Sequence, residues 1–189
     1  MKIKNHQKNK GFTLIELMVA TSIFIIVMLA SMSSLFILLD AAKSSRALRS
    51  AMDNVSFAMD SMTRSIRMGT NYYCVTATNN IDLSNMDITN DCSSTDNGTL
   101  IAFKPKGSAD NKVAYKLSGD SIERCGEGNP CVPIISPDVK IEKLKFIVRG
   151  SNGDDNIQAS VYIIMKGTVY VKGVPTSFAI QTMASQRNF

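Results

Sequence analysis

The sequence has few of the residues and motifs that carry enzyme chemistry. Its only histidine is His6, and no C-x-x-C pair occurs. Neither G-x-x-x-x-G-K-[ST] nor G-x-G-x-x-G is present, so there is no glycine-rich loop to hold a nucleotide phosphate. We therefore expect a protein that is not an enzyme and that has no cofactor. The one enzymatic alternative left open is catalysis by a pair of carboxylates.

Charge is absent from a long stretch near the N-terminus. Residues 17–39 contain no charged side chain, and residues 12–39 contain only Glu16. These 28 residues are more than the roughly 20 that an apolar helix needs to cross a bilayer. No A-x-A cleavage site follows them. The four lysines before residue 12 favour a cytoplasmic N-terminus. We expect a single pass through the cytoplasmic membrane, with the C-terminal part exported.

Glycine and proline are also absent from residues 12–68, and Gly69 follows. Because both residues weaken or break helices, their absence over these 57 residues predicts one long helix that ends at Gly69. Residues 12–39 form its membrane-spanning part, and residues 40–68 form an amphipathic continuation. Apolar side chains of the continuation recur every three or four residues: Leu48, Met52, Val55, Met59, Met62 and Ile66. This stripe should pack against the rest of the same chain.

A short motif joins the basic leader, residues 1–11, to the apolar run. Residues 10–16 read KGFTLIE. The leader, the glycine, this order of residues and the unbroken apolar run resemble the cleavage and methylation signature of type IV prepilins and type II secretion pseudopilins. The resemblance implies that a prepilin peptidase cuts between Gly11 and Phe12 and then N-methylates Phe12. Loss of the leader would remove His6, which leaves no histidine for Ser-His-Asp or Cys-His catalysis.

Glu16 is the one acid inside the apolar run. A carboxylate there costs on the order of several kcal/mol unless it is paired or protonated. Residues i and i+4 share a helix face, so the Phe12 amine could pair with it within one chain. The resemblance implies a different use, in which Glu16 neutralises the Phe12 amine of a subunit already assembled and so steers assembly. The remaining alternative is a carboxylate close enough to the membrane surface to stay hydrated.

The resemblance also implies a function and partners. The implied function is that of a structural subunit of a type IV pilus or a type II secretion pseudopilus. Residues 12–39 would form the filament core after assembly. Its partners would be the prepilin peptidase, other pilin or pseudopilin subunits and an inner-membrane assembly platform, and the filament would be periplasmic or at the cell surface. The absence of proline in the apolar helix, and the ending at residues 178–188, look most like a minor pilin of the PilW-like kind or a J-like minor pseudopilin.

Residues 69–189 change character and predict a β-rich exported head. Turn-forming residues increase and β-branched residues alternate with polar ones. We expect a bulge between Ile141 and Leu144 and a hairpin turn about Gly167. A helix followed by antiparallel strands is an α+β arrangement, as in type IV pilins. The expected strands are Tyr72–Thr78, Thr99–Lys104, Lys112–Leu117, Ser121–Arg124, Val139–Arg149, Gln158–Lys166, Thr168–Lys172 and Ser177–Ala184.

All four cysteines lie in the part expected to be exported, where disulfides persist. Three pairings are conceivable, and the nearest-neighbour choice joins Cys74 to Cys92 and Cys125 to Cys131. A zinc site is disfavoured because the head has no histidine and no C-x-x-C. A calcium site at Asp154 and Asp155 is also disfavoured, because the EF-hand spacing is missing. We therefore expect no metal.

Most of the net charge of +5 lies in the leader, which contributes +4, whereas residues 69–189 are neutral overall. A neutral head gives no broad electrostatic footprint for nucleic acid. We disfavour nucleic acid as a partner and leave open a local patch at Lys140, Lys143, Lys145 and Arg149.

A second interpretation is a membrane-anchored module that presents the head to a sugar, DNA or a protein and never polymerises. It fits the apolar run equally well, but it leaves Gly11, Phe12 and Glu16 unexplained.

Overall fold

The computed structural model describes residues 11–76, 83, 88–93, 98–107, 111–152 and 157–187. The chain divides into two compact units, Met1–Ser45 and Arg46–Phe189. Helix α1 (Leu14–Arg67) supplies residues to both units. Each unit is described by itself.

In the first unit, α1 is a helix whose side chains are almost all exposed. It is long and apolar enough to cross a membrane. Its hydroxyl groups bond to the carbonyl oxygens of the preceding turn: Ser22 Oγ and Ser31 Oγ donate to Met18 O and Val27 O, both at 2.8 Å. These two hydroxyls therefore have partners within the helix itself, which lowers the cost of placing them in hydrocarbon.

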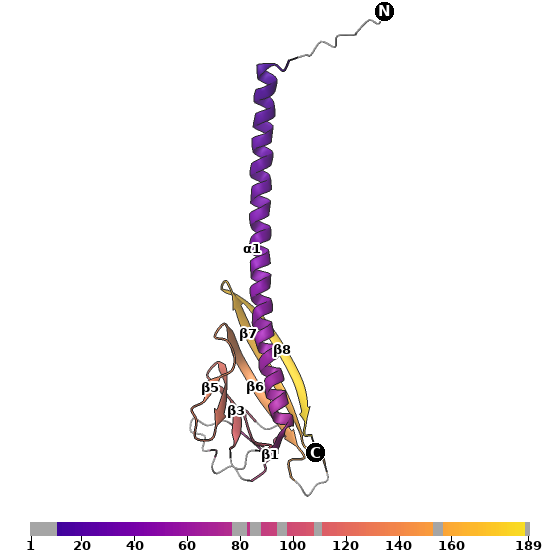
Figure 1. Cartoon of the computed structure of the whole chain (residues 1–189), viewed down its shortest axis with the longest axis vertical. Helices are drawn as coiled ribbons and strands as arrows, with labels where there is room; N and C mark the ends of the chain where they lie inside the picture. Colours follow the sequence, from indigo (N-terminus) through magenta and orange to yellow (C-terminus); the bar gives the residue numbers. More distant parts are fainter. Residues whose placement is uncertain are drawn as a thin grey trace, which may run out of the picture. The chain divides into compact units, whose positions relative to one another are not determined.

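The second unit combines the end of α1 with two antiparallel sheets, as Figure 1 shows. The first sheet has the order β1-β2-β3-β4-β5, and the second has the order β6-β7-β8. The expected α+β class is confirmed. The strands are β1 (Gly69–Val75), β2 (Leu100–Pro105), β3 (Val113–Ser118), β4 (Ser121–Gly126), β5 (Val132–Pro133), β6 (Val139–Arg149), β7 (Ser160–Val171) and β8 (Val174–Ser185).

One apolar core unites α1 with both sheets. Val55, Met62 and Ile66 of α1 are completely buried. They share a cluster with Phe146 of β6 and Ile163 of β7, and with residues of β2, β3 and β4. The stripe expected from the spacing is therefore the buried face of the helix, although Leu48 and Met52 are only partly buried. Ala51 and Ala58 complete that buried face.

The two sheets meet along β6. Phe146 N donates to Gly98 O (2.7 Å), and Val148 N donates to Cys92 O (3.0 Å). The Cys74–Cys92 disulfide then ties this edge to β1. Gly98 lies so close to both sulfur atoms that a Cβ there would be 2.7 Å from Cys74 Sγ. This junction makes the head one folded unit.

The helix ends at Arg67, one residue before the expected end at residue 68. The carbonyls of its last turn find partners in the tertiary structure. The Tyr72 hydroxyl lies 2.8 Å from both Ile66 O and Gly69 O, and Arg187 N donates to Arg67 O at 3.0 Å. Gly69 belongs to β1, and its role is spatial, because a Cβ there would be 2.5 Å from the Phe103 ring.

The expected hairpin about Gly167 is wrong, because β7 runs unbroken through that residue. A Cβ at Gly167 would collide with Lys140 O and would be 2.9 Å from the Phe178 ring. The glycine is thus a point of close contact between strands, opposite the bulge of β6. The real turn is Lys172-Gly173, where both residues have positive φ (51° and 80°), as a type I′ hairpin requires.

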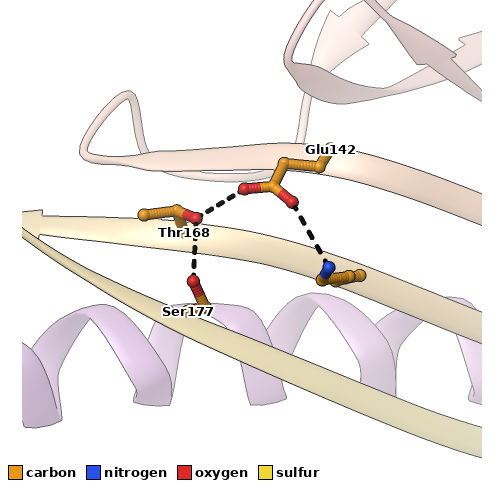
Figure 2. A network of polar contacts seen from close by, with 4 residues as sticks. Glu142, Thr168 and Ser177 are labelled. Carbon is orange, nitrogen blue, oxygen red and sulfur yellow. Dashed lines mark hydrogen bonds and ion pairs between the residues drawn. The ribbon is translucent and has the colours of Figure 1, made fainter.

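The expected bulge in β6 is confirmed: the register of β6 on β7 shifts between Ile141 and Lys143. The extra residue is Glu142, and Figure 2 shows how its carboxylate is held. The Thr168 hydroxyl donates to Glu142 Oε1 (2.6 Å) and lies 3.5 Å from Ser177 Oγ. Lys166 Nζ is 3.9 Å from Glu142 Oε2. The contacts link β6, β7 and β8 on the face opposite the core.

Candidate functional site

The start of α1 is capped by its own sequence. Glu16 N donates to Thr13 Oγ1 (3.4 Å), and Leu17 N donates to Thr13 O (3.2 Å). Thr13 is therefore the N-cap, and Glu16 is the third residue of the helix, the arrangement of a capping box. The helix begins at Leu14 and not at the expected Phe12. The Thr-x-x-Glu spacing in the sequence was sufficient to identify this cap.

Gly11 and Phe12 precede the helix and are exposed. The bond between them is consequently in non-helical backbone, where an enzyme can bind it without first unwinding α1. A Cβ placed on Gly11 would meet nothing within 4 Å. The fold of this chain therefore does not require a glycine at residue 11. Lys10 and the residues before it lie outside the described part of the chain.

Phe12 and Glu16 line one shallow hollow on the side of the first unit, together with four residues further along the same helix. Those four are Leu17, Ala20, Thr21 and Phe24. The lining of the hollow is almost entirely apolar. The acid also lies in the first turn of α1, where the helix dipole favours negative charge by about 0.3–1 kcal/mol at exposed sites. The structure thus places the acid beside Phe12.

The four cysteines form two disulfides, Cys74–Cys92 and Cys125–Cys131. This is the nearest-neighbour pairing of the three that the sequence allowed. A carboxylate oxygen of Glu123 lies within 4.8 Å of the sulfur atoms of Cys125 and Cys131. Those sulfurs are bonded to each other, so they do not present the thiolates that bind zinc. Asp154 and Asp155 lie outside the described residues.

The basic residues of β6 considered as a local patch are Lys140, Lys143, Lys145 and Arg149. Acidic side chains lie close to some of these bases. Lys140 Nζ lies 3.5 Å from Asp120 Oδ2 and 5.7 Å from the centre of the Tyr170 ring. Glu142 is the bulged residue between Lys140 and Lys143. Two acids, Asp120 and Glu142, therefore lie among the basic side chains at this end of β6.

A family model, the prokaryotic N-terminal methylation motif, matches residues 6–32. The match covers the KGFTLIE sequence, the start of α1 and most of the apolar run. It supports processing at the N-terminus and anchoring in a membrane, as in pilin-type and pseudopilin-type subunits. The chain matches no curated protein and no solved structure.

Proposed function

We propose that this chain is made as a precursor, cut between Gly11 and Phe12, methylated on the Phe12 amine and assembled into a filament through α1. The filament is a type IV pilus or a type II secretion pseudopilus, and the chain is a minor structural subunit of it. The observation that carries the proposal is the methylation motif at residues 6–32, within which Gly11 and Phe12 are exposed and directly precede a capped apolar helix.

The geometry of Gly11 supports cleavage by a separate enzyme. Nothing in the described chain lies near the Cβ that a larger residue would add, so the need for glycine lies in a partner that approaches the backbone closely. The partner is the prepilin peptidase. The basic leader keeps this end of the chain in the cytoplasm, and the apolar part of α1 crosses the membrane.

Glu16 supplies the assembly contact. A lone carboxylate among apolar side chains is costly unless a cation neutralises it. In the monomer the carboxylate lies in the first turn of α1 beside Phe12. In the filament the Glu16 carboxylate pairs with the Phe12 amine of a neighbouring subunit. Only a subunit at the correct axial position then leaves neither of the two charges unpaired. The inner-membrane platform and the other subunits are the remaining partners, and the chain performs no catalysis.

Mass spectrometry of the membrane-extracted protein tests the processing step. We expect an intact mass that lacks residues 1–11 and an N-terminal peptide that begins with methylated Phe12. The matched variant is Gly11→Val, which should fold identically because its side chain meets nothing, yet should keep the leader. A wild-type chain that retains Met1 and the leader would contradict the proposal and favour the uncleaved anchored module.

The variant Glu16→Gln tests the assembly step separately from processing. It keeps the size of the side chain and removes the charge. We expect normal cleavage at Gly11 and at least a tenfold loss of the mature chain from the filament fraction of cells. The control is Thr13→Ala, which removes the N-cap and costs about 1 kcal/mol of helix stability but keeps the carboxylate, so incorporation should persist. Normal incorporation of Glu16→Gln would show that the charge does not steer assembly.

A further inference from the structure

The two sheets have four edges, and three of them are covered or very short. Asn90 pairs with β1: Cys74 N donates to Asn90 O, and Asn90 N donates to Tyr72 O, both at 3.0 Å. The β5 edge is two residues long. The edge of β6 is occupied by Gly98 and Cys92, as described above. The fourth edge is β8, the last strand of the second sheet.

The hydrogen-bond pattern shows which groups of β8 face away from the sheet. Phe146 N donates to Gly98 O, so the backbone groups of Phe146 point away from β7. Its partner Ile163 must then direct its own N–H and C=O towards Thr182 of β8. Because the directions alternate along a strand, the residues whose backbone groups face outward are Pro175, Ser177, Ala179, Gln181, Met183 and Ser185.

This outward edge has almost none of the protection that soluble proteins give to exposed strands. The 12 residues of β8 include no charged side chain, and their register on β7 has no bulge. Ser177, Ala179, Gln181 and Met183 are exposed. Within the described part of the chain, no hydrogen bond involves the outward N–H groups of these four residues. The one protective residue is Pro175, which has no N–H to offer.

We propose that β8 is an assembly edge, which receives an extended, uncharged segment of a neighbouring subunit as a fourth strand of this sheet. The occupant must be extended, because only a strand can satisfy a row of alternating N–H and C=O groups. It is uncharged along the contact because β8 offers no charge to pair with. The Thr168–Ser177 contact in Figure 2 holds the first part of β8 against β7 and so presents a preformed edge.

The occupant is a segment other than β8 itself. Two β8 strands from two copies would form a closed symmetric pair, in which neither β8 edge remains free for a further subunit. A filament grows by contacts between two different surfaces, which leave the next subunit a free edge. The inference deepens the proposed function and rests on it, since it names the surface through which the head contacts its neighbour.

Gln181→Pro tests the edge with little change to the fold. Proline removes the outward N–H of residue 181, whereas the bonds between Thr182 and Ile163 remain. The matched control is Gln181→Thr, which changes the side chain but keeps the N–H. We expect both variants to be cleaved normally and to melt within a few degrees of the wild type. The proline variant should fall at least tenfold in the filament fraction, and the threonine variant should incorporate as the wild type does.

A second variant covers the case in which Gln181→Pro fails to fold. Ala179→Lys places a charge on the exposed edge without touching the bonds to β7, and charge is how natural edges are blocked. Its control is Val132→Lys, a charge on β5, whose side chain is 50% exposed. We expect Ala179→Lys alone to lose incorporation. Equal incorporation of Ala179→Lys and Val132→Lys would overturn the proposal, as would full incorporation of a folded Gln181→Pro.

The results distinguish a failure of the β8 proposal from a failure of the proposed function. If Glu16→Gln is excluded from filaments while the β8 variants enter normally, the edge proposal fails alone. If the wild-type chain is absent from every filament, both fail. A symmetric dimer of the detergent-solubilised full chain that Gln181→Pro abolishes would overturn the choice of occupant.

Discussion

Tyr72 and Tyr115 are two buried phenols that contact the same ring, Phe103, with centroid distances of 6.3 and 6.0 Å. They differ in their hydroxyl groups. The Tyr72 hydroxyl bonds to the end of α1. The Tyr115 hydroxyl has no hydrogen-bond partner among the described residues. A buried polar group stabilises a fold only if it is hydrogen-bonded. Replacing each tyrosine by phenylalanine should therefore change the free energy of unfolding by different amounts.

We expect Tyr72→Phe to lower the free energy of unfolding by about 1–2 kcal/mol, because the helix carbonyls lose a donor. Tyr115→Phe should be neutral or slightly stabilising, because it removes an unpaired hydroxyl. Urea denaturation of the two variants measures both effects. The opposite order would show that the hydroxyl of Tyr115, and not that of Tyr72, is the bonded one.

The same residue gives a pH dependence. Burial raises the pKa of the Tyr72 phenol above its usual 10.0. In the unfolded chain the phenol ionises near pH 10, whereas in the folded chain it stays protonated, so the unfolded state binds fewer protons. The free energy of unfolding should therefore fall as the pH rises above about 10. Unfolding measured between pH 9 and 11 tests this, and in Tyr72→Phe the fall should be smaller.

At the scale of the element, β7 and the β6 bulge depend on each other. Glu142 adds a residue to β6, and Gly167 on β7 lets the bulged backbone approach to contact distance. The Phe178 ring of β8 also packs against the same glycine. Bulge, glycine and ring therefore form one packing unit across three strands, which explains why a glycine is tolerated in the middle of a 12-residue strand.

We expect Gly167→Ala to cost about 1–3 kcal/mol, because the added methyl group overlaps the Lys140 carbonyl and the Phe178 ring. The matched control is Gly126→Ala in β4, where the nearest atom is an Asn129 side-chain nitrogen at 3.5 Å. That control should change the melting temperature little. Equal melting temperatures for the two variants would mean that the backbone of β6 can move away from β7.

At the scale of the whole molecule, the two units have separate tasks. The first, Met1–Ser45, carries the processing motif and the apolar part of α1. The second, Arg46–Phe189, has its own core, which begins at Ala51 of the helix. The core of the second unit therefore uses no residue of the first. The end of α1 belongs to that core.

We expect a chain that begins at Arg46 to fold in solution with both disulfides formed, because it keeps the whole core. A chain that begins at Gly69 should not fold, because it lacks Val55, Met62 and Ile66. Truncating one such side chain costs about 2–5 kcal/mol, against a total stability of about 5–15 kcal/mol for a domain. Near-ultraviolet circular dichroism distinguishes the two. A folded chain beginning at Gly69 would show that α1 only covers a head that is stable alone.

The sequence by itself determined the features that depend on neighbouring residues. The long helix, its apolar half and its buried stripe follow from composition and a period of 3.6, which are local properties. The motif around Gly11 and Glu16 is local as well, and the Thr13 cap could have been read from its spacing. The bulge near Glu142 was visible in the sequence, because the alternation of apolar residues shifts by one position between Ile141 and Leu144. The class of fold and the processing motif were therefore accessible without coordinates.

Only the tertiary structure decided the features that join residues far apart in the chain. The last carbonyl of the helix finds its partner far along the chain, where Arg187 N donates to Arg67 O. Gly167 lies inside a strand because the β6 bulge and Phe178 need the space of its missing side chain. The strand order leaves β8 as the one long open edge in the described part of the chain. A glycine in a sequence has the same local signature in a turn and under a close contact, and a strand has the same pattern at an edge and in a sheet centre. The difference arises from long-range pairing, which local patterns do not encode.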